Sequence, residues 1–178
     1  IPGVMGFRWT QQVRPMNIDV PVAYVEPPHH RYQGNRDLWG YPQGEGTLIL
    51  SDSGDTYVGN FKDGKFDGDG TMTYANGDVY KGKWIDNEFF GEGNMKYVDG
   101  STYVGNFHSG TWHGEGKFTH INGDDYEGNF NNGVSCGYGV YTWCQNTDET
   151  PWFYQGNFKN DKAHGLGKKY LGKKGYFY

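Results

Sequence analysis

The sequence is poor in the residues that normally fill a thick hydrophobic core. Hydrophobic residues make up 35% of the 178 positions and aromatic residues alone 18%, so few aliphatic side chains are present. No apolar run reaches the roughly 18–20 residues of a transmembrane helix. The chain has two cysteines and no Asn-x-Ser/Thr glycosylation sequon. These absences argue against a deep globular core and a membrane span, and we expect an intracellular protein.

Negative charge dominates most of the chain. The net charge is −5, but residues 159–178 hold six lysines against Asp161, which leaves −10 for the preceding 158 residues. An acidic body repels nucleic acid and anionic lipid, so we expect no nucleic-acid partner. Only the C-terminal lysines are suited to an anionic surface: Lys168, Lys169, Lys173 and Lys174. The alternative is that they solvate a strand edge and discourage mispairing.

Thirty glycines and a repeated Tyr-x-Gly triplet organise the rest. Units that begin at these tyrosines are separated by 25, 23, 23, 23 and 28 residues. Such a constant interval is the signature of a repeat architecture. The six units begin at Tyr32, Tyr57, Tyr80, Tyr103, Tyr126 and Tyr154.

Each unit alternates with a period of two, which is typical of strands. Tyr57, Gly59 and Phe61 share one face of a first strand, and Gly-x-Gly opens a second strand in every unit. Polar residues such as Asn60 and Asp69 occupy the other face. The pattern therefore predicts successive hairpins with one aromatic face and one wet face.

The glycines on the aromatic face leave hollows in which rings from neighbouring strands can lie, recovering what glycine costs a strand. Three dipeptides, Asn76-Gly77, Asp99-Gly100 and Asn122-Gly123, are expected to close tight hairpin turns, because they tolerate positive φ. The predicted fold is an elongated, single-layer, antiparallel all-β meander. Each two-strand unit should advance about 9–10 Å.

These residues resemble the MORN (membrane occupation and recognition nexus) repeat family. Its unit, Tyr-x-Gly-x-Phe/Trp followed by Gly-x-x-x-Gly-x-Gly, is matched by the segments 57–70, 80–93 and 103–116. The first, fifth and sixth units depart from it, the sixth having Asp161 where a turn glycine is usual. We predict six MORN-type repeats over residues 32–178.

The resemblance implies a broad role and no particular one. Proteins similar to this act as scaffolds, tethers and assembly subunits in cytoskeletal, ciliary and membrane-associated complexes, and phosphoinositide binding is often attributed to the family. It implies a cytoplasmic, cytoskeletal or ciliary location, an organellar membrane complex being the alternative.

Residues 1–31 lie outside the repeats. Three prolines (Pro21, Pro27 and Pro28) exclude a central strand there. We expect this arm to cap the first hairpin; the alternative is an extended hook that uses Phe7 and Trp9 as anchors.

The aromatic face is the leading candidate for a site, because a contiguous exposed apolar strip usually marks a partner surface. A helical or extended segment of a partner is expected to lie in this groove. Its predicted lining residues are Tyr57, Phe61, Tyr74, Tyr80, Trp84, Tyr97, Tyr103, Phe107, Phe118, Tyr126, Phe130 and Trp143. The alternative is that these rings only hold the ribbon together.

No residue set predicts catalysis, a cofactor or a metal. His113, Cys136 and His164 share one unit position, but equivalent positions lie about 9–10 Å apart and cannot converge on one ion. The acids Glu45, Asp69, Glu92 and Glu115 recur on the wet face, as solvation requires, and Asp63–Gly70 lacks the spacing of a calcium loop. Cys136 and Cys144 should remain free thiols, since about 25 Å separates them along one extended strand.

We therefore expect a non-enzymatic scaffold or accessory subunit that binds proteins within a larger assembly. The alternative is a membrane-tethering module for anionic lipid. A third possibility is the regulatory repeat domain of an enzyme.

Overall fold

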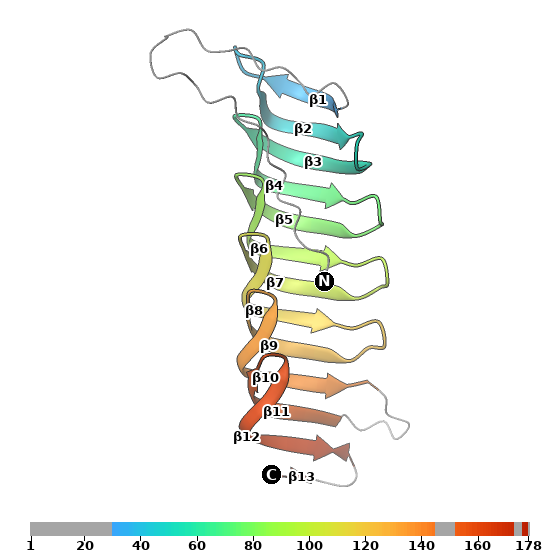
Figure 1. Ribbon diagram of the computed structural model, residues 1–178, viewed down its shortest axis with the longest axis vertical. Coiled ribbons are helices and arrows are strands. Elements are labelled where there is room, and N and C mark those ends of the chain that lie inside the picture. Colours follow the sequence, from blue (N-terminus) through green and yellow to red (C-terminus); the bar gives the residue numbers. More distant parts are fainter. Residues whose placement is uncertain (1–29, 145–151, 173–175, 178) are drawn as a thin grey trace.

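The computed structural model describes residues 30–144, 152–172 and 176–177, which form one open antiparallel sheet. Its 13 strands follow one another in sequence order, each paired with the next, and they stack into a long ladder (Figure 1). The predicted all-β meander is thereby confirmed. The described part of the chain contains no helix suited to crossing a membrane. The predicted N-terminal arm lies outside the described residues, except for its last two.

The strand bounds follow the repeat. They are β1 His30–Arg36, β2 Pro42–Leu50, β3 Asp55–Lys62, β4 Lys65–Thr73, β5 Val79–Ile85, β6 Glu88–Lys96, β7 Thr102–His108, β8 Thr111–Thr119, β9 Asp125–Asn131, β10 Val134–Trp143, β11 Trp152–Lys159, β12 Lys162–Leu171 and β13 Tyr176–Phe177. Each even-numbered strand from β2 to β12 pairs with its odd-numbered predecessor as a hairpin.

Tight turns and longer loops connect the strands, and the tight turns do not lie where we predicted them. Two-residue turns with positive φ at both positions, as type I′ geometry requires, join the strands of the hairpins from β3–β4 to β11–β12; Asp63-Gly64 (φ 51° and 79°) is one. Residues 37–41 join β1 to β2 instead. The predicted Asn76-Gly77 lies instead in a longer loop between hairpins, where only the glycine has positive φ. There the Gly77 amide donates to the Tyr74 carbonyl at 2.9 Å. Asp161 replaces glycine in the last tight turn, yet it reaches φ 62° after Asn160.

A bulge bends each hairpin near its middle. Within the β3–β4 pair Gly59 lies opposite Gly70 and Phe61 opposite Phe66, so two extra residues are accommodated on β4. The first glycine of the Gly-x-Gly pair, Gly68, lies in the bulge with φ 96°. Such bulges bend and twist a strand. The edge that carries the tight turns consequently curls over one face of the sheet (Figure 1). This is the aromatic face, because Phe66, next to the tight turn, stacks on Tyr57.

The second glycine of Gly-x-Gly has a different role, because the tyrosine ring packs directly on it. A β-carbon added to Gly93 would lie 2.6 Å from the Tyr80 Oη, and one added to Gly82 would lie 2.5 Å from the same atom. Gly82 and Gly93 are cross-strand partners. The ring therefore covers a pair of facing glycines, one on its own strand and one on the next. The same arrangement recurs at all six unit tyrosines.

Rings from three directions then enclose each central tyrosine. Around Tyr80, Phe89 stacks at a centroid distance of 3.9 Å, while Trp84 and Phe107 meet it edge-on at 5.2 and 5.0 Å. Tyr80 is consequently 0% exposed. The core is thus one continuous file of rings, closed by the curl of a single sheet and by the rings themselves.

Candidate functional site

The predicted groove is mostly filled. Eight of its twelve predicted lining residues are buried, with exposures of 0–5%, so the expectation that they form an open partner surface is wrong. They are Tyr57, Phe61, Tyr80, Trp84, Tyr103, Phe107, Tyr126 and Phe130. The bulges cause this burial, because they bring the start of each even-numbered strand over the tyrosine of its own hairpin. These eight rings thus mainly form the core of the ribbon, which is the alternative given above, that the rings hold the ribbon together.

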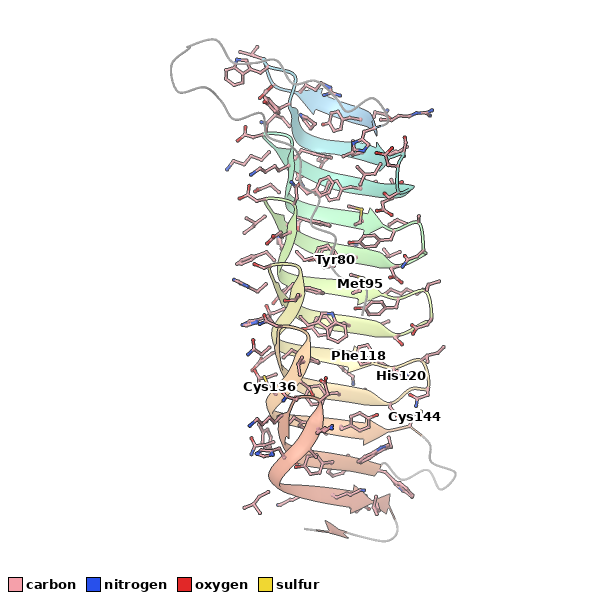
Figure 2. All side chains as sticks on the ribbon, viewed as in Figure 1. Tyr80, Met95, Phe118, His120, Cys136 and Cys144 are labelled. Atoms are coloured by element: carbon pink, nitrogen blue, oxygen red, sulfur yellow. The ribbon has the colours of Figure 1, made fainter. Side chains whose placement is uncertain are left out.

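The other four predicted residues remain partly exposed: Tyr74, Tyr97, Phe118 and Trp143. They lie at or near the C-terminal ends of the even-numbered strands, close to the long loops. Phe118 follows Tyr80 and Met95 along the stack of strands (Figure 2). Trp112 and Tyr141 are partly exposed beside them. We call these six residues the aromatic strip.

Ring contacts join five of the strip residues into two groups. Trp112 lies 5.1 Å from Phe118 and 6.2 Å from Tyr97, measured between ring centroids, and Tyr141 lies 5.0 Å from Trp143. Edge-to-face and offset contacts at such distances stabilise aromatic pairs. The strip therefore offers preformed groups of partly exposed rings.

Burial raises the pKa of the three strip tyrosines, Tyr74, Tyr97 and Tyr141. It raises the pKa of Tyr97 to about 12, with Asp78 and Asp99 adding to the effect and Trp112 opposing it. Burial also raises the pKa of Tyr141 to about 12, and its hydroxyl donates a 3.0 Å hydrogen bond to the Asp124 carboxylate. The strip tyrosines are neutral at pH 7 even with an ordinary pKa, and the raised pKa extends this into alkali. The strip offers ring faces and neutral hydroxyls, which suit recognition of another protein's side chains.

A ladder of acidic and hydroxyl side chains beside the strip escaped the sequence analysis. Asp55 Oδ1 accepts the Ala75 amide at 2.9 Å, and Asp78 Oδ1 accepts the Val98 amide at 2.8 Å. Each bond joins a side chain at the start of a hairpin to a backbone amide in the loop that follows the same hairpin. Equivalent bonds follow along the chain, from the Ile121 amide to Ser101 Oγ and from the Cys144 amide to Asp124 Oδ1.

This ladder had a readable signal, because its four side chains recur every 23 residues, two positions before each tyrosine. Asp55, Asp78 and Ser101 are at most 7% exposed, so each bond satisfies a buried polar group. At Asp124 burial opposes ionisation, but hydrogen bonds from Cys144, Tyr141 and Asn122 outweigh it and lower the pKa of this carboxyl. The ladder fixes the loop edge that carries the aromatic strip.

The remaining candidates do not converge. In the described ranges, no three or more His, Cys, Asp or Glu side chains are grouped to hold a metal ion. Cys136 and Cys144 are free, the first at the tight-turn edge and the second at the loop edge (Figure 2). Asp69, on the wet face, pairs with Lys83 at 2.8 Å and is exposed to solvent.

The C-terminal lysines are only partly described. Lys168 and Lys169 are exposed on β12, and the Lys169 Nζ lies 5.1 Å from the centre of the Trp143 ring, in cation–π geometry. Lys173 and Lys174 fall outside the described residues.

Comparison with known families identifies the repeated unit. The family model for the MORN repeat matches five times, at residues 57–79, 80–102, 103–125, 126–147 and 154–175. These matches cover more than half of the chain, and the first four begin at the 23-residue interval. The unit that begins at Tyr32 is outside them. No curated protein is significantly similar to the chain.

Proposed function

The chain belongs to the MORN-repeat family, and on that premise we propose that it is a non-enzymatic scaffold that binds protein partners within a larger assembly. One observation carries the proposal: the aromatic strip stays partly exposed along a ribbon whose central rings are buried in its own core. Among the described residues no second layer covers the strip. Partly exposed rings on a preformed support form a surface suited to protein docking.

The architecture supports this role. Hairpins at a constant interval repeat the same side chains at constant spacing, and the ladder of Asp55, Asp78 and Ser101 holds them in register. Preorganised surfaces lose little side-chain entropy on binding, which favours affinity. The docked partner is a helix or an extended segment running along the ribbon. We place the protein in the cytoplasm, the cytoskeleton or a cilium.

Affinity isolation of the tagged chain, followed by mass spectrometry, tests the proposal. The test variant combines Tyr97→Ser with Phe118→Ser, which removes two rings of the strip. The control combines Val58→Ser with Val104→Ser, because these valines are 53% and 52% exposed on the opposite face. We expect the strip variant to lose partners that the control keeps, with both variants folded by circular dichroism. Equal recovery of partners by both would contradict the proposal.

A second candidate function is peripheral binding to anionic lipid. It is favoured by the exposure of Lys159, Lys162 and Lys168 at the last described hairpin. We expect vesicles rich in anionic lipid to retain the chain at low salt and to release it as salt screens the charges. Flotation that Lys168→Glu leaves unchanged would exclude this function for these lysines.

A further inference from the structure

The last described hairpin lacks a ring that three earlier hairpins contain. In those hairpins the second residue of the even-numbered strand stacks flat on the unit tyrosine. The three pairs are Tyr57–Phe66 at 3.8 Å and 17°, Tyr80–Phe89 at 3.9 Å and 18°, and Tyr103–Trp112 at 4.5 Å and 5°. In β12 the equivalent residue is Ala163, which pairs with Phe158 just as Phe89 pairs with Trp84.

Two rings that enclose three earlier unit tyrosines are missing above Tyr154. One is the flat-stacked ring of its own hairpin, where Ala163 stands, and the other, among the described residues, is the edge-on ring that Phe107 supplies to Tyr80 from the following hairpin. Whereas Tyr57, Tyr80 and Tyr103 are 0% exposed, Tyr154 is only half-buried. A cavity lies there, and its aromatic lining consists of Tyr138, Tyr141, Trp143, Tyr154 and Phe158. Ala163 also lines it. We call this cavity the ring seat.

Another hairpin also lacks the ring but has no such seat. Ser135 takes the equivalent place in β10, opposite Phe130. Ser135 is 6% exposed and its amide donates to Asp161 Oδ1 at 2.7 Å, while Phe158 meets Tyr126 edge-on at 4.8 Å, as Phe107 meets Tyr80. Neither Ser135 nor Tyr126 lines the cavity. The opening therefore belongs to Tyr154 and Ala163.

Positive charge borders the seat. Lys168 and Lys169 line it, and Lys169 replaces the apolar residue that faces the unit tyrosine in the preceding hairpins, such as Met95 opposite Tyr80. Asp161 is the one acid in the lining, and its Oδ1 is occupied by the Ser135 amide. The acidic body and this basic border give the ribbon opposite charge at different places.

We propose that the ring seat binds an aromatic side chain from an acidic, extended segment of a protein partner. The chain itself shows which group fits, because Phe66, Phe89 and Trp112 fill the same position on three other tyrosines. Acidic residues beside the incoming ring would pair with Lys168 and Lys169. This inference rests on the proposed function and names one partner chemistry for a site beyond the central part of the aromatic strip.

Calorimetry of the full chain with synthetic peptides tests the proposal. The probe is a capped pentapeptide with one tryptophan between two pairs of glutamates. Replacing its tryptophan by leucine should weaken binding roughly two- to tenfold, the contribution of a stacked ring pair. Replacing its glutamates by lysines should remove measurable binding. Equal binding of the tryptophan and leucine peptides would overturn the proposal.

A variant that fills the seat from within provides the matching test. Ala163→Phe should stack its own ring on Tyr154, raise Tm and lose the peptide. The control Ala75→Phe adds a ring at an exposed alanine in the loop after β4 and should bind like the parent chain. If Ala163→Phe fails to fold, Lys168→Glu with Lys169→Glu replaces it and should also abolish binding. Unchanged peptide affinity in a folded seat variant would overturn the proposal.

The result is separable from the test of the aromatic strip. The peptide measurements use variants in β12, whereas the partner isolation uses Tyr97 and Phe118. If the peptide does not bind but the strip variant still loses partners, the ring-seat proposal is wrong and the scaffold proposal stands. If the peptide binds and the strip variant loses no partners, the ring seat is the docking site and the central part of the aromatic strip is not.

Discussion

The hydroxyl of Tyr80 donates a 2.9 Å hydrogen bond to the backbone carbonyl of Lys83, three residues along the chain. The same bond runs from Tyr57 to Asn60 and from Tyr103 to Asn106. It explains why the unit begins with tyrosine, although phenylalanine would cover the glycines equally well. The bond lets the chain bury the ring without leaving its polar end unsatisfied.

Removing this hydroxyl should therefore destabilise the ribbon. Tyr80→Phe leaves the Lys83 carbonyl without that donor, and we expect the free energy of unfolding to fall by about 1–2 kcal/mol. Chemical denaturation monitored by circular dichroism measures the change. Tyr138→Phe serves as the control, because Tyr138 is 57% exposed, and its effect should stay below about 0.5 kcal/mol. Equal effects at both tyrosines would contradict this role of the hydroxyl.

The two glycines of one Gly-x-Gly pair should respond differently to alanine. Gly93→Ala places a β-carbon against the Tyr80 ring and should lower the free energy of unfolding by about 3 kcal/mol, because the ring must move away from the glycine pair. At Gly91 a β-carbon meets nothing within 4 Å, so only its φ of 65° opposes the change. Gly91→Ala should cost about 1–2 kcal/mol. The order of the two denaturation midpoints checks the assignment, and a reversed order would refute it.

The sequence predicted the features that arise from the repeat itself. The 23-residue interval and the alternation of Tyr80, Gly82 and Trp84 predicted hairpins, one aromatic face and rings lying over glycine, all of which the structure shows. These features depend on local spacing along one chain segment. The prediction erred in one detail, since each ring covers glycine on its own strand as well as on the neighbouring one.

What depends on cross-strand register could not be predicted in the same way. The bulge at Gly68 offsets β3 from β4, and that offset buries Phe61 and Phe66 together. Alternation alone carries no information about such an offset, so the groove was predicted open. The turn assignments failed for a related reason, because Asn76-Gly77 and Asp63-Gly64 both suit a tight turn and only strand pairing selects between them.

The polar ladder at the loop edge should contribute to stability. Asp78→Ala removes the acceptor for the Val98 amide, and we expect a loss of about 1–2 kcal/mol in the free energy of unfolding. Asp78→Asn keeps a side-chain oxygen and should retain most of that stability. Glu92→Ala, at an exposed acid on the wet face, controls for the loss of charge. If asparagine and alanine are equally destabilising, the hydrogen bond is not what the ladder contributes.

The enclosed tyrosines predict a particular behaviour in alkali. Burial, with Cys136 and Asp161 adding to it and a hydrogen bond opposing it, raises the pKa of Tyr126 to about 12, above the ordinary value of 10.0. A raised folded pKa gives stability that is complete below pH 10 and is lost as the pH rises towards 12. The ultraviolet absorbance of tyrosinate should therefore rise together with unfolding in that window. Ionisation of all tyrosines near pH 10 in a folded chain would contradict the burial.

Proton NMR of the glycines tests most directly the central claim, that a tyrosine ring lies on a pair of facing glycines in every hairpin. The faces of the Tyr80 ring should shift the α-protons of Gly82 and Gly93 upfield, and Tyr80→Leu should return both signals to the ordinary glycine range. Gly91, which the ring does not cover, should keep its signal. Ordinary α-proton shifts for Gly82 and Gly93 in the folded parent chain would contradict the account.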